Sequence, residues 1–74
     1  MTAIIRPTSA LRMYLDGKDE AEVEAGRTVR ETLISLNIKP ELIALIVVDG
    51  EQKTKDYIIQ DGDLVKVLAV IGGG

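Results

Sequence analysis

Hydrophobic and polar residues alternate in two short stretches near the start of the chain. In residues 11–15 (LRMYL), three apolar residues alternate with an arginine and a tyrosine, and the turn-forming pair Asp16-Gly17 follows. In residues 20–24 (EAEVE), an alanine and a valine alternate with three glutamates, as in a strand with one face in water. The pattern therefore predicts a β-hairpin over residues 10–24.

A helix is predicted directly after this hairpin. Thr28-Val29-Arg30-Glu31 matches a capping box, in which the threonine hydroxyl and the glutamate carboxylate each satisfy a backbone N–H at the helix start. Val29, Leu33 and Leu36 recur at helical spacing, and Asn37 tolerates the left-handed conformation that ends many helices. We expect one amphipathic helix of about three turns that ends near residue 36.

Two longer apolar runs predict the main strands of the second half. Residues 42–48 (LIALIVV) are apolar at every position and end at a turn pair, and residues 64–71 (LVKVLAVI) form a closing strand. Between them we expect a brief return strand over residues 51–54, and then a loop or helical turn that tucks Ile58 or Ile59 under the domain. A single helix can cover only one face of such a sheet, so the opposite face must be polar or must meet a partner.

The chain is predicted to be one domain. Its 74 residues are near the lower limit of what one hydrophobic core can stabilise. Residues 1–9 show no sustained period and contain Pro7, so we expect a partly flexible lead-in there. The domain itself is expected over residues 10–71, and a flexible glycine tail over residues 72–74.

The composition restricts the chemistry that the chain can perform. It contains no cysteine and no histidine, which removes disulfides, thiolate metal sites and the commonest general base. Nine basic and twelve acidic residues give a formal charge of −3 in mixed order, so no general attraction to nucleic acid or membranes is expected. We expect a cytoplasmic protein that is not an enzyme by itself.

Several charged groups are interpreted as structural or solvated. Asp61-Gly62-Asp63 is predicted to be a turn, with metal ligation as the less favoured alternative, so no metal site is expected. Three glutamates are interpreted as a solvated strand face: Glu20, Glu22 and Glu24. Three lysines are also interpreted as solvated, with contact to an acidic partner surface or chemical modification as the alternatives: Lys53, Lys55 and Lys66.

Four aliphatic residues form a candidate docking patch. If Ile46, Val48, Val65 and Val67 face the helix, alternation along the two strands places the patch on the open side of the sheet: Leu45, Val47, Leu68 and Val70. An exposed aliphatic cluster of this kind marks a partner surface. The alternatives are the opposite register, or a cover formed by the N-terminal stretch Ile4-Ile5.

These features together resemble the ThiS/MoaD family of sulfur carrier proteins, which share the β-grasp fold of ubiquitin. The resemblance rests on the order of elements, on the motifs "VVDGE" and "QDGDLVKV", and on the final pair Gly73-Gly74. It implies an α+β, β-grasp domain with a mixed four- or five-stranded sheet packed on one helix. The tail "VIGGG" is closer to ThiS, whereas the short interval between the two Asp-Gly turns is closer to MoaD.

The resemblance also implies a function centred on the last residue. A ubiquitin-activating-type enzyme would adenylate the Gly74 carboxylate, and sulfur transfer would convert it to a thiocarboxylate. Gly72 and Gly73 would thread through the enzyme's narrow channel, because glycine has no side chain to obstruct it. The implied partners are this adenylating enzyme, a sulfurtransferase or cysteine desulfurase, and a sulfur-accepting synthase.

No permanently bound cofactor is expected, since the partner enzyme would use the ATP and the sulfur donor. The sulfur would serve thiamine thiazole or molybdopterin synthesis, and related carriers serve tRNA thiolation and cysteine synthesis. Two other functions remain open: a ubiquitin-like modifier conjugated to lysines through Gly74, and a β-grasp binding module without tail chemistry. By itself the chain is expected to be a monomer.

Overall fold

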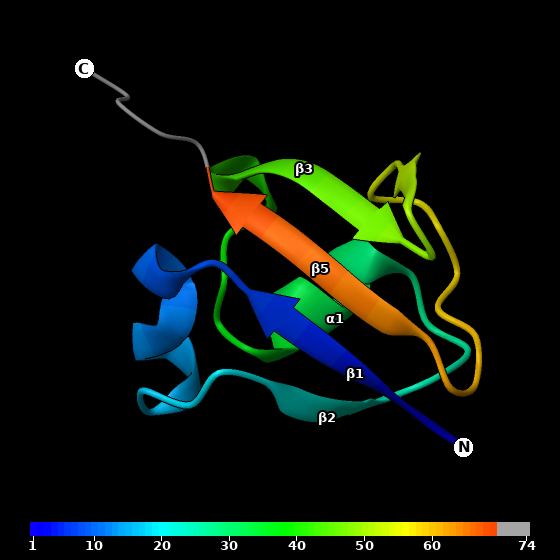
Figure 1. The fold of residues 1–74 in the computed structure, drawn as a ribbon, viewed down its shortest axis with the longest axis horizontal. Coiled ribbons are helices and arrows are strands. Elements are labelled where there is room, and N and C mark those ends of the chain that lie inside the picture. The colour runs from blue at the N-terminus through cyan, green and yellow to red at the C-terminus, as the bar shows by residue number, and fades with distance from the viewer. Residues whose placement is uncertain (70–74) are drawn as a thin grey trace.

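Residues 1–69 form one mixed five-stranded sheet with a single α-helix against one face (Figure 1). The computed structural model describes the backbone of residues 1–69 and, except at positions 9 and 10, their side chains. The strands lie in the order β2-β1-β5-β3-β4. The elements in chain order are β1 (Thr2–Pro7), the 3₁₀ helix η1 (Ser9–Leu15), β2 (Ala21–Glu24), α1 (Val29–Ser35), the 3₁₀ helix η2 (Pro40–Leu42), β3 (Ile43–Val48), β4 (Glu51–Lys53) and β5 (Leu64–Ala69).

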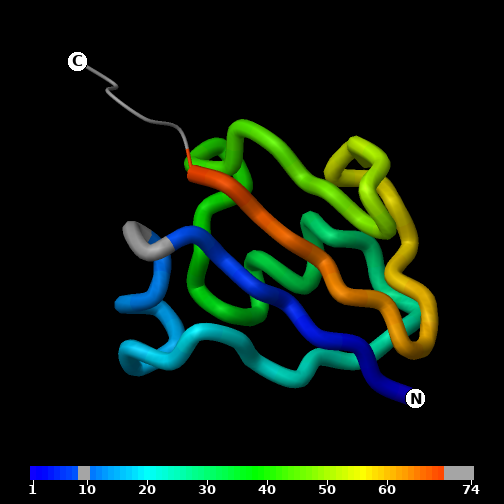
Figure 2. Tube along the Cα trace, viewed as in Figure 1, coloured from blue at the N-terminus to red at the C-terminus, as the bar shows by residue number. Residues whose placement is uncertain are grey.

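The N-terminal stretch is a strand inside the sheet, so the expectation of a flexible lead-in over residues 1–9 is wrong. β1 pairs antiparallel with β2 and parallel with β5. Figure 2 shows β1 and β5 running side by side in the same direction, although they lie at opposite ends of the sequence. Ala3 and Ile5 are 3% and 1% exposed, because every second residue of β1 faces the helix.

The predicted hairpin over residues 10–24 is also wrong in its first half. Residues 9–15 form η1 rather than a strand, with Leu11 and Leu15 buried and Met13 75% exposed. Two residues with positive φ end this helix, Asp16 at 56° and Gly17 at 79°. β2 forms as predicted but pairs with β1, with Val23 opposite Ala3. The alternating apolar residues at positions 11, 13 and 15 therefore belong to a short 3₁₀ helix and not to a strand.

The helix begins where the capping box predicts. The Thr28 hydroxyl accepts a hydrogen bond from the Glu31 N–H at 3.1 Å, and the Glu31 carboxylate accepts one from the Thr28 N–H at 3.0 Å. Val29 and Leu33 are fully buried against the sheet, while Ile34 faces outward. α1 is shorter than expected, ending at Ser35, and Asn37 takes the predicted left-handed conformation at φ 63°.

The remaining strands agree with the sequence pattern. β3 is antiparallel to both β5 and β4. Ile59 rather than Ile58 is the residue tucked under the domain, with exposed fractions of 0% and 52%. The core lies between α1 and the helix-facing side chains of the strands, chiefly Ile5, Ile46, Val48, Val65 and Val67.

Candidate functional site: the open face of the sheet and the end of β5

β5, the strand that precedes the C-terminal residues, is the central strand of the sheet. Ala69, the last described residue, is paired with Ile43 of β3. On the other side, the Thr8 N–H donates to the Val67 carbonyl at 3.0 Å, and the Thr8 hydroxyl accepts from the Ala69 N–H at 3.4 Å. The strand that precedes the tail is therefore held on both sides up to Ala69. Gly74 is the fifth residue beyond it.

Four of the predicted site residues lie outside the described residues: Val70, Gly72, Gly73 and Gly74. The roles assigned to them from the sequence stay predictions.

The other three patch residues share the face of the sheet opposite α1, the face that Figure 1 presents to the viewer. Leu45, Val47 and Leu68 are half-buried and alternate with residues that face the helix. Leu45 lies directly opposite Leu68 in the β3–β5 pairing. The expected register is therefore the observed one, and Ile4-Ile5 does not cover the patch, because β1 lies beside β5 in the same sheet. Their role in docking stays a prediction.

The same face contains residues that the predicted docking patch did not include. Ile4 of β1 lies opposite Leu64 of β5, and Arg6 lies opposite Lys66. Lys66 also lies opposite Val47 of β3. Ile4 and Arg6 were missed because β1 was not recognised as a strand, whereas Lys66 was considered from the sequence, with contact to an acidic partner surface as its less favoured alternative. The available signal in the sequence was the short apolar run of residues 3–5 (AII), which ends in two β-branched residues.

Two charged side chains occupy the middle of this open face. The Arg6 guanidinium binds the Glu20 carboxylate, with Nη2 and Nε 2.7 Å and 3.2 Å from the same oxygen. Both side chains remain nearly half exposed, at 49% and 43%, so the pair is screened by water and contributes little to stability. Lys66 is exposed and forms no ion pair with any residue of the described chain.

The Asp61-Gly62-Asp63 turn has the structural role expected of it. The Asp63 carboxylate accepts hydrogen bonds from the Tyr57 hydroxyl at 2.6 Å and the Gln60 N–H at 2.9 Å. The bond to Asp63 favours the protonated phenol and raises the pKa of Tyr57 to about 12. Asp61 accepts a bond from the Thr2 N–H at 3.1 Å, which ties the turn to β1.

Two kinds of feature are absent from the described part of the chain. Within residues 1–69 there is no group of three or more acidic side chains arranged to hold a metal ion. None of the helices in that range is long and apolar enough to cross a membrane.

Comparison with known proteins agrees with this architecture. The chain is similar to a Pyrococcus furiosus protein described as a molybdopterin converting factor, subunit 1, with a TM-score of 0.71 and 23% identity over 96% of this chain and 99% of the other. It is also similar to SAMP1 from Haloferax volcanii, with a TM-score of 0.68 and 14% identity over the full length of both chains. At these identities the two similarities establish the β-grasp fold. No curated protein matches the chain.

A family model identifies the chain itself. The model of the ThiS family matches residues 9–74, which is most of the sequence and includes the glycine tail. The predicted resemblance is therefore confirmed, together with the ubiquitin-like β-grasp fold. The protein belongs to the ThiS family.

Proposed function

We propose that this protein is a sulfur carrier whose Gly74 carboxylate is activated by a partner enzyme. The observation that supports this most is that the ThiS family match extends through Gly74. A second support is the position of β5, which is hydrogen-bonded on both sides up to Ala69 and precedes the glycine tail. A rigid strand before a side-chain-free tail suits delivery of a terminal carboxylate into another protein's active site.

The proposed chemistry has two steps. In the first, a carboxylate oxygen of Gly74 attacks the α-phosphorus of ATP, forming an acyl adenylate and releasing pyrophosphate. In the second, a hydrosulfide-level sulfur from a donor attacks the activated carbonyl carbon, and the bond to AMP breaks. The product is a thiocarboxylate. The partners supply ATP and sulfur, because this chain has neither the cysteine nor the histidine that such steps commonly use.

The partners of the proposed reaction are an adenylating enzyme of the ubiquitin-activating type, a sulfurtransferase or cysteine desulfurase, and a synthase that accepts the sulfur. The activating enzyme would dock on the open face, using the apolar contacts of Leu45, Val47 and Leu68, with Val70 as a fourth predicted contact. Half-buried aliphatic side chains on the uncovered face of a sheet suit such a surface.

Intact-protein mass spectrometry tests this function. The chain is incubated with its cognate activating enzyme, ATP and a sulfur source. The carrier function predicts a mass increase equal to the difference between sulfur and oxygen. A variant with one alanine added after Gly74 is the matched control and should show no increase, because the carboxylate is displaced from the reactive position. Stable conjugates to lysines would instead identify a protein modifier, and an unchanged mass for the natural chain would refute activation altogether.

A further inference from the structure

The open face has an unusual arrangement of charge at its centre. Arg6 and Lys66 are direct neighbours on the parallel strands β1 and β5, with strand axes about 4.8 Å apart. On one side of this pair lies the aliphatic pair Leu45 and Leu68, and on the other lies the pair Ile4 and Leu64. We call Arg6 and Lys66 the cationic row. It crosses β1 and the central strand β5 between two apolar rows.

The fold gains nothing evident from the second charge of this row. Like charges on neighbouring strands repel one another. Glu20 compensates Arg6 at 2.7 Å, but no carboxylate of the described chain lies within ion-pair distance of Lys66. An aliphatic residue at position 66 would match the apolar rows on either side. Because Lys66 is exposed, water solvates its charge in the free chain, and the charge becomes costly only when a partner covers this face.

A partner that covers this face must offset the cost of removing the charges of the cationic row from water. It cannot bury the two apolar rows without also covering the cationic row between them. Removing a charged ammonium group from water without a partner is costly, and a carboxylate at hydrogen-bond distance offsets that cost. The surface that docks here must therefore present acidic side chains between apolar ones.

We propose that Arg6 and Lys66 receive acidic side chains of the activating enzyme and thereby select that enzyme among possible partners. This inference rests on the proposed function and names the chemistry of its docking surface. Arg6 would exchange or share its Glu20 contact on binding, and Lys66, which has no ion pair within residues 1–69, would gain a carboxylate partner. Partners without acidic groups at this place would be rejected, because Lys66 would be buried without any carboxylate and the Arg6–Glu20 pair would lose its contact with water.

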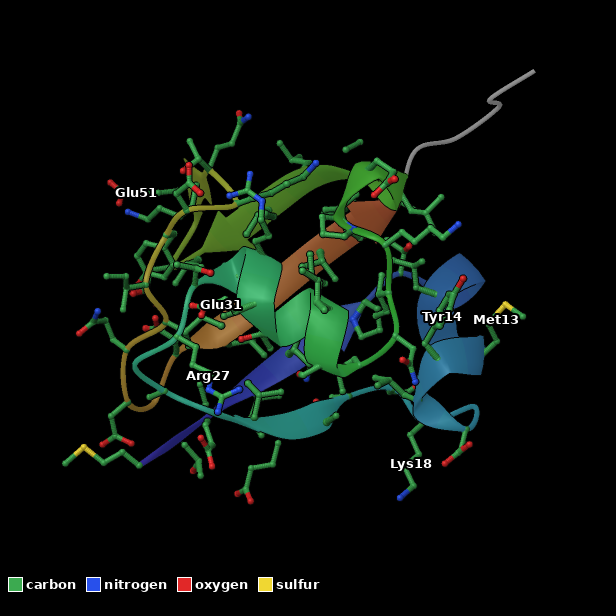
Figure 3. The ribbon with its side chains drawn as sticks, turned by 180° about the vertical axis from the view of Figure 1, so that it is seen from behind. Met13, Tyr14, Lys18, Arg27, Glu31 and Glu51 are labelled. Carbon is green, nitrogen blue, oxygen red and sulfur yellow. The ribbon has the colours of Figure 1, made fainter. Side chains whose placement is uncertain are left out.

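The kinetics of adenylation, followed by ATP–pyrophosphate exchange, test this inference. Lys66→Glu reverses the charge, and its carboxylate lies beside Arg6, so the fold is retained. We expect the KM for the carrier to rise about tenfold or more with kcat little changed, since the contact affects docking rather than the reacting atoms. Lys18→Glu makes the same charge change at a side chain that points away from the sheet beside η1 (Figure 3), and should leave KM within about twofold.

A second variant separates docking from stability. Lys66→Leu should retain or raise the thermal midpoint, because it removes the repulsion with Arg6, yet it should also raise KM. The KM of the natural chain should increase with salt concentration, and this dependence should weaken in both Lys66 variants. Exchange activity with unchanged KM in both variants would overturn the inference and leave the carrier function standing. Absence of exchange with the natural chain would overturn both.

Discussion

Replacing Ile5 by alanine tests whether β1 is an integral strand of the core. Ile5 is 1% exposed, packs on the helix side of the sheet and lies opposite Val65 of β5. A buried isoleucine truncated to alanine costs about 2–5 kcal/mol, through lost burial and the cavity left behind. The free energy of unfolding of a 74-residue domain is about 4–11 kcal/mol, at about 0.05–0.15 kcal/mol per residue. The substitution should therefore remove a large share of the stability.

Ile4→Ala is the matched control, because it deletes the same atoms one position away on the opposite face. Ile4 is only half-buried, so the cost should be about 1 kcal/mol. Urea unfolding followed by circular dichroism measures both values. A loss of about 3 kcal/mol for Ile5→Ala also corresponds to a fall of about 12–24 °C in the thermal midpoint. Equal losses for the two variants, or a loss below about 1 kcal/mol for Ile5→Ala, would show that β1 does not pack in this register.

Three further predictions concern the cap, the DGD turn and the docking patch. Thr28→Ala removes the helix cap and should cost about 1 kcal/mol in urea unfolding. Hydrogen bonds from Thr28 lower the pKa of Glu31 below its usual value of 4.5. The stabilisation from these bonds is therefore present above pH 4.5 and is lost as the pH falls through the pKa of Glu31 in the folded protein. The decrease in unfolding free energy at acid pH should be smaller in Thr28→Ala. The pKa of Tyr57 is raised from 10.0 to about 12, so the stabilisation from its hydrogen bond to Asp63 is present below pH 10 and is lost as the pH rises toward 12. In an ultraviolet absorbance titration, the natural chain should show a tyrosine ionisation near pH 12, and Tyr57→Phe should lack it. Leu68→Asp should raise the KM for adenylation about tenfold while the circular dichroism spectrum stays native, and a spectrum of an unfolded chain would place Leu68 in the core instead.

Local sequence signals succeeded where the responsible interaction is local. The capping box joins residues three positions apart, and its two hydrogen bonds form as the sequence predicts. The apolar run of β3 is also read correctly, because a strand covered by α1 on one face and open on the other retains aliphatic residues on both. The alternation of Leu45 and Val47 with Ile46 and Val48 then follows from the geometry of any strand.

The misinterpreted segments depend on partners distant in sequence. Residues 2–7 show no apolar-polar alternation over residues 3–5 and end in a proline, so their pattern alone did not predict a strand. They become one because β5, some sixty residues later, offers a parallel partner, and because β2 covers their other edge. Leu11, Met13 and Leu15 alternate like strand residues, yet β1 already occupies the place that a hairpin partner would need, and the segment closes into η1 instead.

The sequence by itself determined the capped helix and the two apolar strands of the second half through local periodicity, and the fold class and membership of the ThiS family through motifs at fixed spacing. Only the tertiary structure decided which residues share the open face. Side chains in different strands become neighbours through the pairing register, which hydrogen bonds between distant segments establish. The meeting of Arg6 with Lys66, at the centre of the proposed docking surface, is a property of that register.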